Sequence, residues 1–382
     1  MIYLDHAATT PLRPEVEAAL ESAGREGFAN PSSQHAAGRR ARQILEDARE
    51  RILAALGSRS TGPDRHRLVF TSGATEANRL AVLGMVPSPT GAVAVSARDH
   101  GSVLSAANTL SLRPGWSVTQ MPLGSHGALA ADPVADWLER TQDRQCRVLC
   151  TTLVCGQTGT LEPFLLDATE KHRTFHVHVD ATQAVACLGI DVAHLGVATM
   201  TLAPHKFGGP RGIGCLVIRG DVTLEPLHPG PQETGMRGGT EPVALAAGFA
   251  TAIELACEER GALARRLAAL RERFEAGVLA AANRHGIAAT IVGAAAARSP
   301  HVSTIGFHGR DRQAIVMAAD LAGLSCATGT ACASGSSEPA PALAAMGLPA
   351  EVAQGAVRFS FGRSTTADDI DRAITILETV LA

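Results

Sequence analysis

Short apolar runs alternate with amphipathic stretches between about residues 60 and 220. The apolar runs predict buried strands: "RLVFT", "AVAVS", "RVLCTTLV", "FHVHVD" and "IGCLVIRG". The stretches between them have helical spacing: "TEANRLAVLGMV", "DPVADWLERTQ" and "PFLLDATEKH". Strands that alternate with helices indicate βαβ units, so we expect an α/β fold with a mainly parallel sheet that helices cover on both faces.

The pattern changes after residue 240. An Ala- and Arg-rich stretch predicts one long helix over about 241–284, and the strands "VSTIGFHG" and "AVRFSFG" follow it. The last helix is expected to begin at Thr366, with Asp369 at the third helical position, which is a capping-box arrangement. We therefore predict a large α/β domain and a smaller α+β domain that are joined through the long helix.

Length, composition and charge exclude several classes of protein. The chain has 382 residues, enough for two domains, with 46% hydrophobic residues, 19% charged residues and a net charge of −3. No basic stripe indicates a nucleic acid as an obligatory partner, and no apolar run is long enough for a membrane helix. The first residues, "MIYLDHAATTP", place Asp and His where a signal peptide would be apolar, so we expect a cytoplasmic protein.

Eight cysteines in a chain of this length do not predict a disulfide scaffold. Several lie in strand-like runs and are expected to be small buried hydrophobes, and zinc is set aside because no C-x-x-C pair occurs. Cys332, in "SCATGTACASGSSEP", differs because small polar residues surround it. A nucleophilic cysteine needs such exposure and freedom of movement, and we favour this interpretation over a spare surface thiol.

Asp180 and Lys206 form the pair that most strongly predicts chemistry. Asp180 ends the strand "FHVHVD", and Lys206 follows in "APHKFGGPRG", where turn-forming residues fix the backbone. An acid at the carboxyl end of a parallel strand faces the crevice where open α/β sheets bind ligands. Pyridoxal phosphate needs such a carboxylate for its ring nitrogen and a lysine amine for its aldehyde. The alternative is a helix-capping Asp and a surface Lys.

Three further segments could complete such a site. In "FTSGATEAN" a strand, a small turn and a helix follow one another, so free amides and the Thr75 hydroxyl could hold a phosphate, although an ordinary capped helix begins in the same way. His100 follows another strand and could stack on a flat ring and move protons, or serve as a structural histidine. Arg358 could clamp a substrate carboxylate, or be a surface arginine on a strand edge.

Taken together, these segments resemble the cysteine desulfurases of the NifS/IscS-like group in the class V aminotransferase family. Nine motifs occur in the order found in that family: "YLDHAATTP", "NPSSQHAAG", "TSGATEAN", "DHGSV", "HVDATQAV", "PHKFGGPRGIG", "MRGGTEP", "GTACASGSSEP" and "VRFSFGRSTT". The resemblance implies fold type I of the pyridoxal-phosphate enzymes. That fold has a large domain, 13–255, with a mainly parallel seven-stranded sheet, and a smaller α+β domain, 1–12 and 256–382, that carries the cysteine loop.

The resemblance also implies a role for each matching residue. Lys206 would carry pyridoxal 5'-phosphate as a Schiff base, Asp180 would pair with the ring nitrogen, and Gln183 would bond the phenolic oxygen. His100 would stack on the ring and take part in catalysis. The phosphate would be held by Ala74, Thr75 and His205.

For the substrate, the resemblance implies that Arg358 takes the carboxylate of L-cysteine. Cys332 would attack the substrate sulfur, keep it as a persulfide and release alanine. Thr240 would reach across a two-fold axis to the phosphate of a second copy, which implies a homodimer. The persulfide would pass to an acceptor protein that serves iron–sulfur cluster assembly, tRNA thiolation or DNA phosphorothioation.

Two departures from the family pattern leave alternatives open. Ala203 stands where the family has a serine that bonds the phosphate, and "CGQTG" stands where it has "NNE-x-G", so that Cys155 and Gly156 replace two asparagines. We expect the cofactor to be retained but turnover to be slow. The alternatives are a cysteine β-lyase or epimerase of the same family, and a weakly active sulfur-transfer scaffold.

Overall fold

A seven-stranded sheet forms the centre of the structure, a computed structural model that describes residues 1–62, 65–85, 89–163, 175–329 and 339–382. In their order across the sheet, the strands are β2 (His66–Thr71), β8 (Gly214–Arg219), β7 (Thr199–Leu202), β6 (His176–Asp180), β5 (Cys146–Thr152), β3 (Gly91–Ser96) and β4 (Trp116–Met121). Strand β8 runs antiparallel to both of its neighbours, and the other pairings are parallel. The prediction of a mainly parallel seven-stranded sheet is confirmed.

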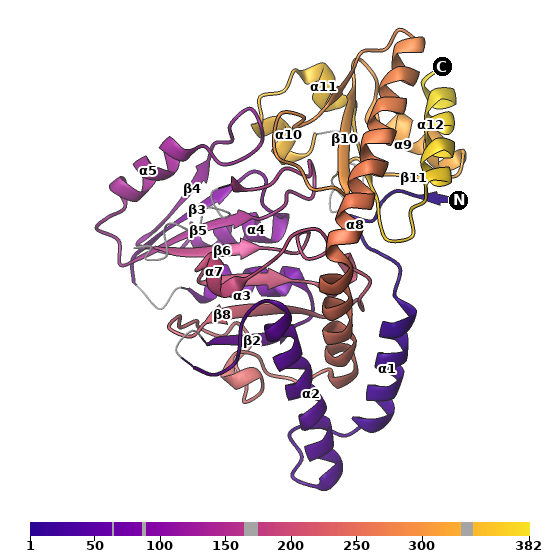
Figure 1. Cartoon of the computed structure of the whole chain (residues 1–382). Coiled ribbons are helices and arrows are strands. Elements are labelled where there is room, and N and C mark those ends of the chain that lie inside the picture. The colour runs from indigo at the N-terminus through magenta and orange to yellow at the C-terminus, as the bar shows by residue number, and fades with distance from the viewer. Residues whose placement is uncertain (63–64, 86–88, 164–174, 330–338) are drawn as a thin grey trace.

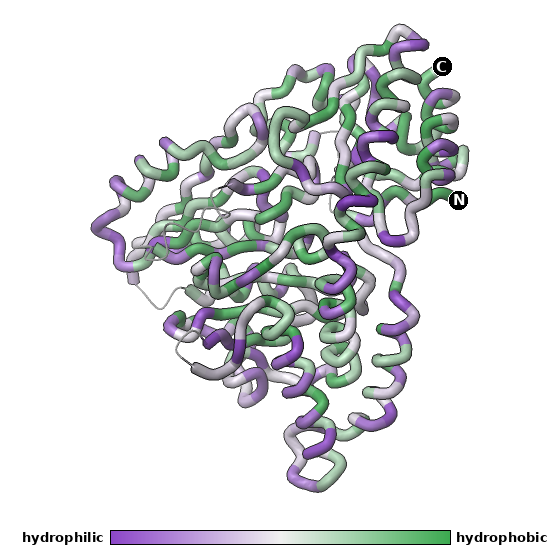
Figure 2. The backbone as a smooth tube through the Cα atoms, viewed as in Figure 1, coloured by the Kyte–Doolittle hydropathy of each residue, from purple (hydrophilic) through white to green (hydrophobic). Residues whose placement is uncertain are grey.

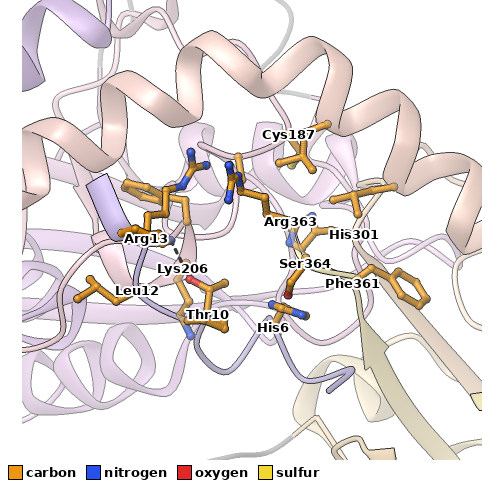
Figure 3. Close-up of a pocket in the computed structure, with 18 residues that line it drawn as sticks. His6, Thr10, Leu12, Arg13, Cys187, Lys206, His301, Phe361, Arg363 and Ser364 are labelled. Atoms are coloured by element: carbon orange, nitrogen blue, oxygen red, sulfur yellow. Dashed lines mark hydrogen bonds between the residues drawn. The ribbon is translucent and has the colours of Figure 1, made fainter. Parts of the chain in front are cut away.

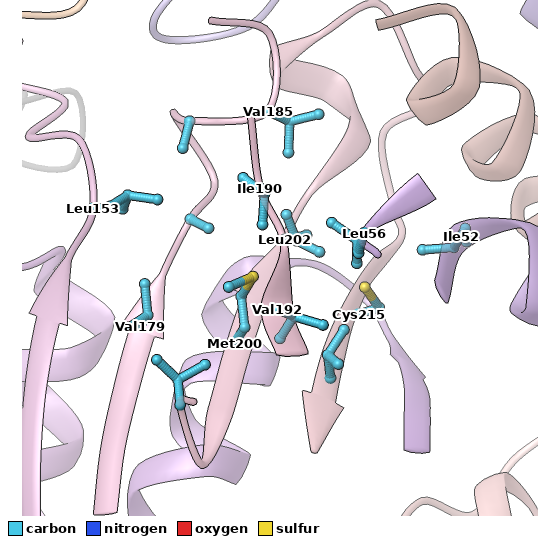
Figure 4. Packing of buried hydrophobic residues seen from close by; sticks show 14 of the residues in the cluster. Ile52, Leu56, Leu153, Val179, Val185, Ile190, Val192, Met200, Leu202 and Cys215 are labelled. Carbon is cyan, nitrogen blue, oxygen red and sulfur yellow. The ribbon is translucent and has the colours of Figure 1, made fainter. Parts of the chain in front are cut away.

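Helices cover both faces of this sheet because alternate residues of each strand are apolar on both sides. In β2, Leu68 and Phe70 belong to one buried cluster and Val69 to another. The cluster that contains Phe70 is shown in part in Figure 4, where Met200, Leu202 and Cys215 pack near Leu56. In Figure 2 the strands are mostly green, and purple residues concentrate on the outer helices and loops.

The helices divide between the two faces. Those that contribute to the cluster of Phe70 are α1 (Pro14–Glu26), α2 (Ala36–Ala55), α5 (Ala131–Arg140), the short α7 (Val192–Leu195) and the first part of α8 (Val243–Arg284). Those on the opposite face are α3 (Ala74–Gly84) and α4 (Gly101–Leu110). The predicted helix "PFLLDATEKH" lies almost wholly outside the described residues.

Helix α8 confirms the predicted long helix and joins two hydrophobic cores. Its first part packs against the large sheet, and its second part contributes Phe274 to a separate cluster, where the ring contacts Phe359 and Phe361. Figure 1 shows α8 running from the region of α1 and α2 to the part of the molecule that holds both ends of the chain.

Two small sheets build this second part. In the three-stranded antiparallel sheet, β10 (Val302–Phe307) lies between β12 (Ala356–Ser360) and β9 (Ala289–Ile291), and β1 (Ile2–Tyr3) pairs in parallel with β11 (Leu324–Ser325). Its helices are α9 (Arg312–Leu321), α10 (Pro341–Ala345), α11 (Ala350–Gln354) and α12 (Ala367–Leu381). Ile2 and Leu4 pack in the cluster of Phe274, which supports the predicted boundaries, 13–255 against 1–12 and 256–382; we propose them on this ground.

Within the described part of the chain, we find no helix with the length and apolar character that crossing a bilayer requires.

The predicted capping box of the last helix is confirmed and gives a stability test. The Thr366 side chain accepts a hydrogen bond from the Asp369 amide, and the Asp369 carboxylate accepts one from the Thr366 amide. Thr366→Ala should lower the free energy of local opening of α12 by about 1 kcal/mol, because an orphan amide of the first turn loses its partner. Hydrogen exchange of the peptide that covers α12 measures this loss.

The matched control is Thr375→Ala on the same helix, where the hydroxyl bonds the Asp371 carbonyl and caps nothing. Exchange in this control should stay as slow as in the unsubstituted chain or become slower, since alanine favours helix. Equal acceleration in both variants would show that the cap contributes nothing.

Candidate active site

Five of the predicted site residues follow the carboxyl ends of parallel strands. Asp180 is the last residue of β6, Gln183 follows in the next turn, Lys206 lies beyond β7, His100 beyond β3 and Thr75 beyond β2. These strand ends share one edge of the sheet, because all but β8 point the same way. This edge is where open α/β sheets bind ligands.

The Asp180 carboxylate is buried and held by two hydrogen bonds. It is 5% exposed; Oδ1 accepts from the Thr182 amide at 2.9 Å and Oδ2 from the Asn78 side-chain amide at 2.8 Å. A buried carboxylate needs such partners, since burying a charge without them costs several kcal/mol. Each oxygen keeps lone pairs that could accept from a positively charged ring nitrogen. Residue 180 caps no helix, so the helix-cap interpretation is wrong.

Lys206 ends a single 3-10 turn, Pro204–Lys206, that follows β7. Gly209 packs closely on this turn. A β-carbon there would lie 2.4 Å from Cβ of Pro204, which explains why position 209 is a glycine. Nζ donates to the carbonyls of Ala7 and Ala8 at 2.7 and 2.8 Å, and Gln183 Nε2 donates to the same Ala7 carbonyl at 2.8 Å. The segment after β1 therefore brings Lys206 and Gln183 together.

A cavity of about 240 Å³ has Lys206 in its lining (Figure 3). His6, Arg13, His301 and Arg363 line it together with apolar residues of α8. Of the predicted cofactor residues within the described chain, Lys206 alone belongs to the lining. This cavity therefore does not bring the predicted cofactor residues together.

The N-terminus of α3 is the predicted phosphate cradle. Its N-cap is Gly73, which offers no side-chain cap, and a β-carbon on Gly73 would meet nothing within 4 Å. The first-turn amides of a helix lack partners within the helix, and the positive end of the helix dipole favours a phosphate there. His205 lies with Nδ1 3.2 Å from Thr9 Oγ1, and burial lowers its pKa to about 4, so the imidazole is neutral at physiological pH.

Thr240 lies near the same cradle in its own chain. It lines a second cavity, of about 140 Å³, together with Thr71, Ser72 and Arg237. Arg237 also donates to Glu76 of α3 at 2.7 Å. The role of Thr240 toward a second copy stays a prediction.

His100 caps α4 with its ring. Nδ1 accepts the Ser102 amide at 3.1 Å and lies 2.7 Å from Ser102 Oγ. An acceptor nitrogen carries no proton, so the proton of the neutral ring is on Nε2. The side chain is exposed, as stacking on a ligand requires.

Arg358 lies in β12, and its interpretation as a surface arginine is wrong. The side chain is 6% exposed and donates to the Asp5 carboxylate at 2.8 Å and the Gly156 carbonyl at 2.9 Å. A β-carbon on Gly156 would be 3.4 Å from Gln183 Nε2, so Arg358, Gly156 and Gln183 are neighbours. The backbone of Arg358 exchanges two hydrogen bonds with Ala327.

Burial disfavours the thiolate form of several cysteines. It raises the pKa of Cys146 to about 11 and those of Cys187 and Cys326 to about 12. The thiolate is the nucleophilic form, so these three are poor nucleophiles at neutral pH. Cys332 lies outside the described residues.

Sequence reasoning missed Asn78, Ser102 and His178. Asn78 donates hydrogen bonds to Asp180 and to Ser102, and its side-chain oxygen faces His178. A signal was present for His178, a histidine two residues before Asp180 in the alternating strand "HVHVD", where alternation puts both side chains on one face. Nothing in the sequence indicated that α3 would bring Asn78 to β6.

Comparison with known proteins identifies the family of this chain. The family model described as aminotransferase class-V matches residues 2–373. "Cysteine desulfurase IscS" of Dictyoglomus turgidum is 35% identical over 385 residues, which cover all of this chain and 94% of that protein. The solved NifS-like protein of Rickettsia africae superposes with a TM-score of 0.87 at 27% identity, covering 100% and 99% of the two chains. A structure described as "SspA in complex with cysteine" gives 0.77 at 26% identity, covering 96% and 100%.

The family model over residues 2–373, the relative that covers the whole chain and the shared fold thus agree with one another. The chain belongs to the class-V aminotransferase family, among its IscS/NifS-like cysteine desulfurases.

Proposed function

We propose that the chain is a pyridoxal 5'-phosphate-dependent cysteine desulfurase that converts L-cysteine into L-alanine and leaves the sulfur on Cys332 as a persulfide. The observation that supports this most directly is the placement of Asp180 and Lys206 after the neighbouring strands β6 and β7. A carboxylate and an amine at one strand edge are the two groups that this cofactor needs from a protein.

The residues present fit the cofactor. The N-terminus of α3 would hold the phosphate, Asp180 would accept a hydrogen bond from the ring nitrogen, and Lys206 would bind the aldehyde. When bound, the ring supplies a sink for the electron pair left behind as the substrate's Cα loses its proton. Lys206 Nζ is the base that we assign to this proton, because an unprotonated amine at this edge can accept it.

Arg358 would bind the carboxylate of L-cysteine. Asp5 and Gly156 engage one terminal nitrogen each, and the buried Nε has no hydrogen-bond partner among the residues that the structure describes. A guanidinium has five N–H donors, so donors remain for a substrate carboxylate, and the two existing bonds fix the plane of the group.

Cys332 would carry out the sulfur step. Its thiolate attacks the substrate sulfur, so that an S–S bond forms while the Cβ–S bond breaks. The electron pair of the broken bond stays on the substrate, which takes up a proton and leaves as alanine. The cysteine follows Ala327, which is anchored on Arg358, by five residues, a reach of up to about 18 Å.

The partners follow from this chemistry. A persulfide must be passed on, so we propose an acceptor protein, either a scaffold or a tRNA- or DNA-thiolation protein. We also propose a homodimer in which Thr240 contributes to the second copy's phosphate site. The β-lyase or epimerase and the scaffold remain the alternatives that the first experiment below separates.

Cys332→Ala should lower the rate of alanine formation from L-cysteine on the order of 1000-fold or more, because the nucleophile that takes the sulfur is lost. The visible absorption of the bound cofactor should remain. Alanine and sulfide are measured in the presence of reductant. Cys326→Ala is the control, since burial raises the pKa of that thiol to about 12.

Undiminished sulfide release with pyruvate as the co-product in Cys332→Ala would favour the β-lyase. Absence of alanine with the unsubstituted chain, despite bound cofactor, would favour the epimerase or the scaffold.

Gly156→Asn should raise kcat/KM about fivefold, because the amide restores one hydrogen bond of about 1 kcal/mol at the cofactor or substrate. The position has room, since a β-carbon there is 3.4 to 3.8 Å from the Gln183 side chain, an ordinary contact. Gly156→Ala, which adds the β-carbon alone, is the matched control. If the two variants give equal kcat/KM, the missing asparagine does not limit this enzyme.

A further inference from the structure

A continuous buried network of hydrogen bonds lies behind the two residues expected to face the cofactor ring. It runs from the sheet through helix α3 to helix α4, and its members are Thr199, His178, Asn78, Asp180, Ser102 and His100. All of them except His100 are buried, and Asn78, His178 and Thr199 are fully buried. A buried network of this kind is costly unless every member is satisfied.

The donors and acceptors of the first half are fixed by Asp180. Its carboxylate only accepts, so Asn78 must present Nδ2 to it, at 2.8 Å, and the second hydrogen of Nδ2 goes to Ser102 Oγ at 3.0 Å. Asn78 Oδ1 is then an acceptor and faces His178 Nε2 at 3.1 Å, which places the His178 proton on Nε2. His178 Nδ1 is left to accept from the Thr199 hydroxyl at 2.9 Å.

Burial supports this assignment, because it lowers the pKa of His178 to about 4 despite the nearby Asp180 charge. The ring is therefore neutral at physiological pH and carries the single proton that the network requires.

The second half ends on His100. Because Ser102 Oγ accepts from Asn78, its own hydrogen points to Nδ1 of His100, 2.7 Å away, which also accepts the Ser102 amide. The Ser102 amide alone makes Nδ1 of His100 an acceptor, so the tautomer of His100 does not depend on Asn78. The Asp180 carboxylate does depend on Asn78, because the Asn78 amide donates to Oδ2.

We propose that Asn78 is a positioning residue that sets Asp180 toward the cofactor ring nitrogen. Asn78 lies on α3, whose first turn is the proposed phosphate cradle, so one rigid helix positions both ends of the cofactor. This inference rests on the proposed function, because it requires a pyridine ring to be bound at the strand ends.

The test compares two ligands. The full chain, stripped of cofactor, is titrated with pyridoxal phosphate and with its analogue in which carbon replaces the ring nitrogen, and the two dissociation constants are measured. The unsubstituted chain should prefer pyridoxal phosphate, because only that ligand can bond Asp180. Asn78→Ala should reduce this preference by on the order of 10-fold, as expected when a hydrogen bond to a charged group is lost.

Three variants accompany Asn78→Ala. Asp180→Ala should remove the preference outright, and Leu80→Ala, a buried truncation on the same helix outside the network, should keep it while lowering stability. Asn78→Ser carries the test if Asn78→Ala does not fold, since a hydroxyl cannot donate to both Asp180 and Ser102.

The outcomes separate this inference from the proposed function. An unchanged preference in folded Asn78 variants, alongside its loss in Asp180→Ala, would overturn the positioning role. Failure of the unsubstituted chain to bind pyridoxal phosphate would overturn the proposed function itself.

Discussion

The site depends on a carboxylate that is buried at the end of a strand. Hydrogen bonds from the Thr182 amide and the Asn78 side chain offset the cost of burying Asp180, and neither donor is itself charged. Because neither donor brings a positive charge, the carboxylate stays available to a cation. A protonated ring nitrogen is such a cation, which explains how the fold would favour the protonated form of the ring over the neutral one.

The distribution of lysine and arginine supports the role proposed for Lys206. Of the 34 lysines and arginines in the chain, only Lys171 and Lys206 are lysines. Arginine serves where a permanent charge or a planar fork is needed, as at Arg358 and in the buried pair of Arg98 with Glu162. A guanidinium cannot bind an aldehyde as an amine does, so the role proposed for Lys206 is one that arginine could not fill.

Much of the fold could be predicted from local patterns, because buried strands and long helices leave strong periodicities. Helix α8 and the cap at Thr366 lie where the sequence placed them. Strands β4 and β7 were missed, since β4 is only partly buried and the four-residue β7 is hidden in "VATMTLAPHK". The antiparallel direction of β8 has no local signature.

The site was predictable only as far as each residue belongs to a motif. Asp180 and Lys206 were found in this way, whereas the partners of Asp180 were not, because Asn78 and Asp180 lie far apart in the sequence and meet only once α3 packs on β6. The burial of Arg358 likewise depends on Asp5, which comes from the opposite end of the chain.

The central claim is that Lys206 binds the cofactor covalently. Reduction of the cofactor-loaded chain with borohydride, followed by peptide mass spectrometry, tests it most directly, and Lys171 serves as the internal control because the chain has no third lysine. The account predicts the pyridoxyl phosphate mass on the peptide of Lys206 and none on that of Lys171. An unmodified Lys206 peptide, or equal labelling of both lysines, would contradict it.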